Sequence, residues 1–191
     1  MKYFFYLIIC LLCLLTSCED NNLTTPKPRG YPKISFPEKS FQQFDKDYCK
    51  FNFEYPTYAQ VNQDTLFFNE RPSDQCWFDL EVKQFNAKLH CTYYPVGVIK
   101  SFDQLRADAF EMAQKHNVKA AYIEEQAINK GDGTTGFLFS IEGEVATPLQ
   151  FYLTDEKKHF LRGALYFRSK VQPDSLAPIF NFLKQDVSHL I

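Results

Sequence analysis

Apolar and polar residues alternate along much of the chain from Lys33 onward, which is the pattern of half-buried β-strands. The alternation is clearest in the stretches 49–55, 77–82 and 85–93. In the last of these, the apolar residues Ala87 and Leu89 are separated by polar ones. Strands of this kind bury one face and expose the other, as the strands of antiparallel sheets do. We therefore expect an antiparallel sheet.

Four more strands are predicted further along, at about 119–128, 136–143, 148–154 and 160–168. Glycines and charged residues between them mark the turns. In the stretch 160–168 both faces are largely apolar, which is typical of a strand in the middle of a sheet.

Helical spacing replaces the alternation in two places. Residues 102–116 carry apolar side chains three and four positions apart, and Ser101 with Gln104 forms the signature of a capping box. A second helix is predicted near the C-terminus, with a buried stripe from Leu176 to Val187. We expect Asp174 or Ser175 to cap it, which would place Pro178 in its first turn, where proline is tolerated.

These elements predict the fold class. Strands in sequence with two helices, without regular βαβ alternation, indicate an α+β fold in which helices pack on an antiparallel sheet. The chain has 191 residues, a length that favours one domain, and it contains no internal repeat. We expect a single globular domain over residues 33–191.

The N-terminus has the features of an export signal. The unbroken apolar run 4–15 is too short for a membrane-spanning helix of about 20 residues, but it suits the core of a signal peptide. Leu15, two small residues and Cys18 then follow in the pattern of a bacterial lipobox. We expect residues 1–17 to be a cleaved lipoprotein signal peptide and the thiol of Cys18 to accept a diacylglycerol. The alternative is an ordinary secretory signal with a chance cysteine.

Residues 18–32 are expected to form a lipidated, flexible tether. The stretch contains three prolines and few apolar residues, so it cannot bury enough surface to fold. Two or three acyl chains hold a protein stably on a bilayer, so the lipid on Cys18 would be a permanent anchor. Lys27, Arg29 and Tyr31 form a basic and aromatic spot, suited either to binding a partner or to docking on the protein's own domain.

Composition and charge exclude some classes of function. Apolar residues make up 45% and charged residues 23%, as in a folded globular protein. The net charge of −2 provides no electrostatic footprint for nucleic acid. The four histidines, at positions 90, 116, 159 and 189, stand apart in the sequence, and no metal-binding spacing occurs. We expect no nucleic-acid partner, no metal and no cofactor.

No sequence motif supports catalysis. The glycine-rich stretch 131–136 lacks the lysine of a P-loop and is expected to be a hairpin turn. Glu124 and Glu125 are neighbours on a predicted strand, so they face opposite sides and would not converge on one substrate. We predict that the protein is not an enzyme. The alternative is an envelope hydrolase acting on glycan or peptide, for which Asp155 and Glu124 are the acids to test.

The sequence resembles the gliding motility-associated lipoprotein family GldD. The segments that carry the resemblance follow the lipid cysteine and extend over most of the chain: 26–31 (PKPRGY), 53–56 (FEYP), 76–77 (CW), 151–155 (FYLTD), 159–167 (HFLRGALYF) and 174–178 (DSLAP). The order of elements is also similar to that of the Mog1/PsbP sandwich.

The resemblance implies an accessory lipoprotein of the gliding motility and type IX secretion machinery, acting by binding. It further implies a lipid-anchored place in the cell envelope, with the outer membrane favoured and the domain facing the periplasm. Other proteins of that machinery would be its partners. The family carries no catalytic residue over to this chain.

Three cysteines remain in the folded part: Cys49, Cys76 and Cys91. Export to an oxidising compartment favours one disulfide among them, with one thiol left free. Cys91 shares a strand face with apolar residues, so we expect it to be buried and reduced. A Cys49–Cys76 bridge would close the loosely patterned stretch between two strands, and the resemblance to the family agrees with this pairing. The competing pair is Cys76–Cys91.

Overall fold

The structure is a computed structural model that describes residues 33–66, 71–169 and 173–191. The fold set out below is that of the unit Ile34–Ile191. Cys18, Lys27, Arg29 and Tyr31, together with the predicted signal peptide and tether, lie outside the described residues.

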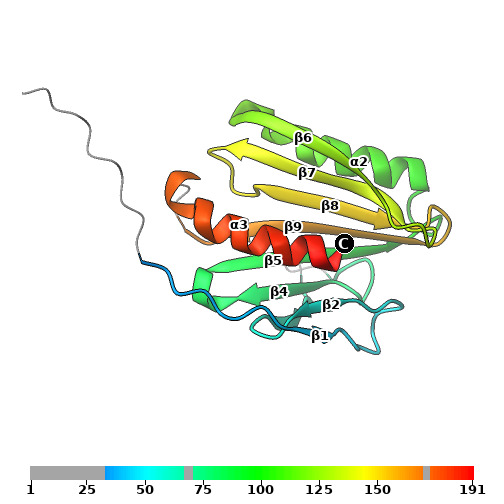
Figure 1. The fold of residues 1–191 in the computed structure, drawn as a ribbon. Coiled ribbons are helices and arrows are strands. Elements are labelled where there is room, and N and C mark those ends of the chain that lie inside the picture. The colour runs from blue at the N-terminus through cyan, green and yellow to red at the C-terminus, as the bar shows by residue number, and fades with distance from the viewer. Residues whose placement is uncertain (1–32, 67–70, 170–172) are drawn as a thin grey trace, which may run out of the picture. The chain divides into compact units, whose positions relative to one another are not determined.

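A seven-stranded antiparallel sheet forms the centre of the unit (Figure 1). Its strands, in spatial order, are β3 (Gln60–Gln63), β4 (Phe78–Val82), β5 (Ala87–Pro95), β9 (His159–Phe167), β8 (Leu149–Thr154), β7 (Thr135–Gly143) and β6 (Ala120–Asn129). The strand β9 is fourth of the seven, which confirms that the strand with two apolar faces is central.

Helices cover both faces of this sheet, which confirms the α+β prediction. The helix α3 (Pro173–Leu190) crosses in front of β9 and β5 in Figure 1, and its Leu183 and Val187 are buried there. On the other face, α2 (Phe102–Gln114) buries Leu105, Ala109 and Ala113 against a separate core cluster. Short 3-10 turns, η1 (Lys83–Phe85) and η2 (Lys115–Val118), complete the helical elements of the described residues.

A two-stranded hairpin precedes the large sheet. It pairs β1 (Phe41–Gln43) with β2 (Glu54–Pro56). The sequence pattern predicted a strand over 49–55, but only its last two residues are in a strand. The carbonyl of Phe53 accepts the backbone N–H of Phe44, but no strand extends over Phe51 and Phe53. The rings of these two residues stack on Phe44.

Of the caps predicted for the two helices, one is confirmed and the other is wrong. The Ser101 hydroxyl accepts the backbone N–H of Gln104, and the Gln104 side chain accepts that of Ser101, which confirms the capping box. The cap predicted for the C-terminal helix is wrong, because α3 begins at Pro173 and includes Asp174 and Ser175. Pro178 therefore lies in the second turn rather than the first.

The segment 34–40 is held on α3 by a buried carboxylate. Asp186, only 5% exposed, accepts hydrogen bonds from Lys39 Nζ (2.5 Å) and from the hydroxyl of Tyr58 (2.5 Å). The same ammonium donates to the carbonyl of Phe182 and lies 3.8 Å from the centre of its ring. One side chain of α3 thus joins the segment before β1 to the loop after β2.

We expect Asp186→Asn to lower the free energy of unfolding by about 1.5–3 kcal/mol, because hydrogen bonds to a charged group are lost while the shape is kept. Chemical denaturation of the two proteins measures this difference. The matched control is Asp103→Asn, which removes the carboxylate of an exposed ion pair on α2 and should change the stability little. Equal effects of the two substitutions would contradict the role given to Asp186.

Candidate functional site

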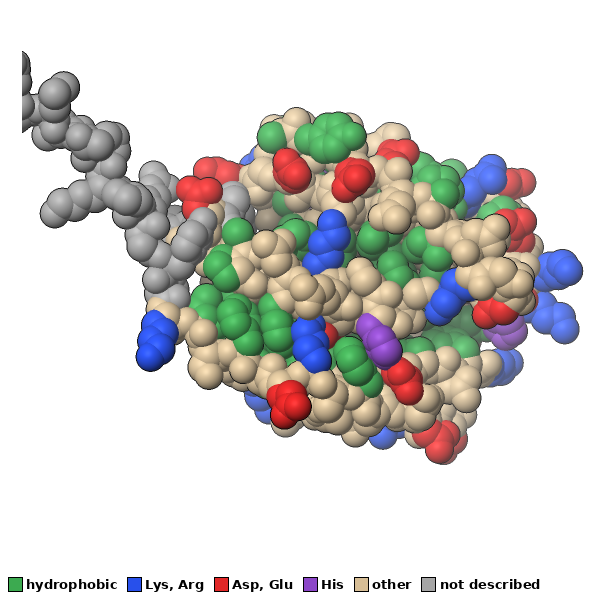
Figure 2. Space-filling model, in the orientation of Figure 1, with side chains coloured by type: hydrophobic (Ala, Val, Ile, Leu, Met, Phe, Trp, Pro, Cys, Tyr) green, Lys and Arg blue, Asp and Glu red, His purple; other side chains and the backbone are tan. Residues whose placement is uncertain are grey.

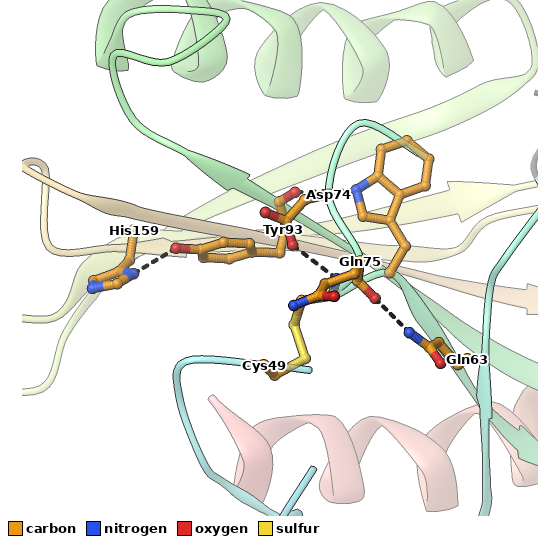
Figure 3. The surroundings of a disulfide bond; sticks show 8 residues. Cys49, Gln63, Asp74, Gln75, Tyr93 and His159 are labelled. Atoms are coloured by element: carbon orange, nitrogen blue, oxygen red, sulfur yellow. Dashed lines mark hydrogen bonds between the residues drawn. A yellow bond between two sulfur atoms is a disulfide. The ribbon is translucent and has the colours of Figure 1, made fainter. Parts of the chain in front are cut away.

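Cys49 and Cys76 form a disulfide, with their Cα atoms 4.9 Å apart (Figure 3). This confirms the predicted pairing over the competing pair Cys76–Cys91. Cys91 is a free, buried thiol, also as predicted. Its burial, with a smaller contribution from the charge of Asp79, raises the pKa of the thiol, so it stays protonated and unreactive.

Local hydrogen bonds fix the chain on the Cys76 side of the bridge. The carboxylate of Asp74 accepts the backbone N–H of Cys76 (2.8 Å), and Gln63 Nε2 donates to the carbonyl of Gln75 (2.9 Å), as Figure 3 shows. The indole N–H of Trp77 donates to the carbonyl of Tyr93 (3.0 Å) on β5. The disulfide therefore joins the loop before β2 to a rigid part of the sheet.

Next to this bridge, a cleft of about 460 Å³ opens at one end of the sheet. We call it the end cleft. It is enclosed by the loop around Phe51, the end of β5, the β6–β7 turn, the β8–β9 turn and the last residues of α3. Its volume is within the range of about 300–1,000 Å³ that is usual for ligand sites.

The end cleft has an apolar wall and a polar rim. The wall consists of Phe51, Phe53, Leu153, Leu161 and Leu190. The rim contains three carboxylates and one lysine: Glu54, Asp132, Asp155 and Lys130. Asn52, Tyr93, Thr134, Thr154, His159 and His189 complete the lining. Because the acids outnumber the lysine, the rim favours a neutral or basic occupant over an anionic one.

A tyrosine–histidine pair lies in the end cleft. The hydroxyl of Tyr93 is 2.7 Å from Nδ1 of His159, and its ring is 5.5 Å from that of Phe51, centre to centre. Figure 3 shows the hydroxyl end of Tyr93 directed at His159. Burial, and then the charges of Asp74 and Asp155, raise the pKa of Tyr93, so the phenol remains a neutral hydrogen-bonding group.

Sequence reasoning treated the histidines as isolated and missed this arrangement. His159 and His189 both line the end cleft, although thirty positions separate them in the chain. His189 Nε2 is 2.8 Å from the carboxylate of Glu54, a bond that joins α3 to β2 at the rim. The other two histidines have structural partners: His90 contacts Asp79, and His116 contacts Thr147.

Asp155, a candidate acid of the hydrolase alternative, has a structural task. Its Oδ1 accepts three backbone N–H groups, those of Lys157, Lys158 and His159, and so organises the β8–β9 turn. Partial burial opposes ionisation, but these hydrogen bonds outweigh it and lower the pKa of the carboxyl to about 2. A carboxylate held in this way is a poor general acid or base at neutral pH.

The pKa of Asp155 predicts a pH dependence of stability. The folded value of about 2 is below the ordinary 3.8, so this carboxylate stabilises the fold above about pH 4 and its contribution is lost as the pH falls towards 2. We expect Asp155→Asn to melt at a lower temperature than the wild type at pH 7. That difference should shrink as the pH falls from 4 to 2, and melting curves measured across this range test it. A difference that stays constant would contradict the assignment.

The second candidate acid lies elsewhere. Glu124 is on β6 opposite Ser140, and its neighbour Glu125 is opposite Phe139. Both side chains are exposed, and neither lines the end cleft. The structure therefore does not bring Glu124 and Asp155 to one site. Among the described residues, no group of three or more histidine, cysteine or acidic side chains is placed to hold a metal ion.

The fold and the end cleft define an α+β domain with a ligand-sized cleft at one end of its central sheet. The chain belongs to the gliding motility lipoprotein GldD family, whose model matches residues 21–191. Membership implies a role in gliding motility and a membrane-anchored place in the cell envelope. In the part of the chain that the structure describes, no helix has the length and apolarity needed to cross a bilayer.

One solved structure similar to this chain is the solution structure of cyanobacterial PsbP (CyanoP) from Synechocystis sp. PCC 6803. The two share 12% sequence identity, with a TM-score of 0.43, over 81% of this chain and 95% of the other. A likeness at this level supports no inference about function. No curated protein sequence matches the chain.

Proposed function

We propose that the protein is a lipid-anchored accessory component of the gliding machinery that acts by binding a partner rather than by catalysis. The observation that carries this proposal is the end cleft: it has the size of a ligand site, but its tyrosine, its histidines and its carboxylates are engaged in holding the fold. Tyr93 with His159, Glu54 with His189, and Asp155 with the backbone are each paired within the chain.

The chemistry of the end cleft suits a segment of a partner protein. Phe51 and Phe53 offer aromatic faces to an apolar side chain, and aromatic anchors of this kind carry much of the energy of protein interfaces. The net negative charge of the rim would attract a basic side chain beside that anchor. The partners we propose are other proteins of the gliding and type IX secretion machinery.

The anchor proposed for this function is a lipid on Cys18. Cleavage after Ser17 would leave Cys18 as the first residue of the mature chain, and the stretch to residue 32 would be a tether to the domain. We propose that the protein is held on the outer membrane and faces the periplasm. Mass spectrometry of the mature protein tests the anchor: a lipid on Cys18 supports it, and an unmodified Cys18 would overturn it.

Deletion of the gene tests the function. We expect deleted cells to stop spreading and to display less adhesin on their surface, and the wild-type gene to restore both. Normal gliding together with normal secretion in the deleted cells would overturn the proposal.

The hydrolase alternative has its own test in the same cells. We expect Asp155→Asn and Glu124→Gln to restore gliding wherever the protein accumulates normally. Loss of gliding in a variant that folds, accumulates and binds partner proteins like the wild type would favour catalysis instead.

The basic and aromatic spot of Lys27, Arg29 and Tyr31 remains a proposed contact site, because it lies outside the described residues. Its test is the double variant Arg29→Ala, Tyr31→Ala. A variant that accumulates normally but does not support gliding would favour a partner-binding role. Full complementation by the double variant would exclude that role.

A further inference from the structure

The strand β6 forms one edge of the large sheet along its full ten residues. Within the described residues it pairs with β7 alone. In an edge strand, the backbone N–H and C=O groups of every second residue point away from the sheet and have no ladder partner. The opposite edge, β3, has only four residues. The described part of the chain therefore presents one long open edge.

The side chains of β6 leave this edge accessible. Glu125 and Ala127 are exposed on the α2 side of the sheet, so α2 does not cover the strand there. On the other side, Tyr122 is 61% exposed, an unusual state for a large aromatic side chain. A strand that adds to the edge could thus reach both the backbone and an aromatic contact.

The charge along the edge is negative at the centre. Glu124 and Glu125 point to opposite faces, and Glu142 and Glu144 lie at the end of the neighbouring β7. Figure 2 shows acidic side chains along the margin that β6 occupies in Figure 1. A strand that pairs here would place Cβ atoms about 5 Å from those of Glu124 and Glu125, close enough for opposite charges to attract.

A second copy of the chain is a poor occupant of the edge. An antiparallel pair of β6 strands matched over residues 120–129 would place Glu124 of each copy directly opposite Glu125 of the other. Like charges in directly opposed positions destabilise a strand pair. Docking of the protein's own segment 26–32, which carries Lys27 and Arg29, is a separate outcome of the test below: β6 would then be protected in the chain without peptide, and the inference would be overturned.

We propose that β6 binds an extended segment of a partner protein, with lysine or arginine at its centre, as an added strand of the sheet. Main-chain hydrogen bonds to the open edge would supply affinity, and the central acids would select the basic partner. This inference deepens the proposed function and rests on it in taking the partner to be a protein. It uses residues that do not line the end cleft.

The experiment uses the full mature chain in nanodiscs of neutral phosphatidylcholine, so that the bilayer does not itself attract a basic probe. The probe is the peptide acetyl-Thr-Val-Lys-Thr-Lys-Val-Thr-amide, and its counterpart has glutamate in place of each lysine. Amide hydrogen exchange is followed along the chain. We expect the lysine peptide to slow exchange at alternate residues of β6 by about tenfold, as new ladder hydrogen bonds require, and the glutamate peptide to leave exchange unchanged.

Two pairs of variants sharpen the test. Glu124→Lys with Glu125→Lys should weaken binding of the lysine peptide about tenfold or more, whereas the same charge change on α2, Asp103→Lys with Glu111→Lys, should not. Of Gln126→Pro and Ala127→Pro, one removes an N–H that faces away from β7 and the other an N–H of the β6–β7 ladder. The variant that loses the outward-facing N–H should keep the wild-type melting temperature and lose peptide binding.

Several results would overturn the inference. The two peptides could bind equally well, or the lysine peptide could slow amide exchange on an element other than β6. Both proline variants could bind the peptide like the wild type. Finally, amide exchange in β6 could already be slowed without peptide, by self-association of the chain. None of these results bears on whether deletion of the gene stops gliding, so the failure of this inference is distinct from failure of the proposed function.

Discussion

Replacing Phe44 by alanine is expected to lower the free energy of unfolding by about 3–5 kcal/mol, the usual cost of removing a fully buried phenylalanine. The side chain of Phe44 is completely buried. Its ring lies 4.6 Å from that of Phe53 and 4.7 Å from that of Phe78, centre to centre. Phe78 belongs to the large sheet and Phe53 to the wall of the end cleft, so this one ring joins the two.

Denaturation by urea measures the loss of free energy of unfolding. Two further variants serve as controls. Phe44→Leu retains most of the buried volume and should lose clearly less stability than the alanine variant. Val98→Ala truncates an apolar side chain that is largely exposed, and it should have almost no effect. A loss below about 1 kcal/mol for Phe44→Ala would show that the hairpin and the sheet are not coupled through this ring.

Removing the disulfide by Cys49→Ala with Cys76→Ala is expected to cost about 3.5 kcal/mol. The bridge spans 27 positions, and closing a loop of that size removes entropy from the unfolded chain by about this amount in the chain-entropy model. The same bridge holds the loop that carries Phe51, so the apolar wall of the end cleft should become mobile as well. Denaturation with and without reductant measures the first effect.

The matched control for the disulfide is Cys91→Ala. Cys91 is buried but unpaired, so its loss leaves the difference between reduced and oxidised protein unchanged. Equal stability of the wild type in the presence and absence of reductant would contradict the stabilising role of the bridge. An alkylation experiment that labels Cys49 or Cys76 in the native protein would contradict the pairing itself.

The regular elements could be predicted from sequence because each depends on local pattern. The period of two in β4 and β5, the two apolar faces of β9 and the Ser101–Gln104 capping box are all visible in short windows of the chain. The C-terminal helix was predicted to begin too late, since Asp174 and Ser175 are common capping residues. The local signal for the earlier start is Pro173 itself, because proline is favoured at the first position of a helix.

The end cleft could not be predicted, because it depends on long-range pairing. Tyr93 and His159 lie 66 positions apart, and the β5–β9 register brings them together by placing Pro95 opposite His159. Phe51 and Phe53 have the alternation of a strand, but they bury their rings by stacking on Phe44. Likewise, the sequence predicted a strand over 119–128 but could not show that β6 is an edge strand, since strand order depends on contacts distant in the chain.

The gliding speed of cells in which the end cleft has been filled tests the central claim most directly. Asn52→Trp with Thr134→Trp would place two large side chains in the end cleft without replacing any residue of its apolar wall. The control, Gln114→Trp with Asn117→Trp, adds the same side chains at exposed positions near the end of α2. With equal amounts of folded protein, we expect the filled variant to glide about tenfold more slowly than the control, because a blocked anchor pocket removes most of the binding energy. Gliding of the filled variant at the speed of the control would contradict the claim that the protein works by binding a partner in this cleft.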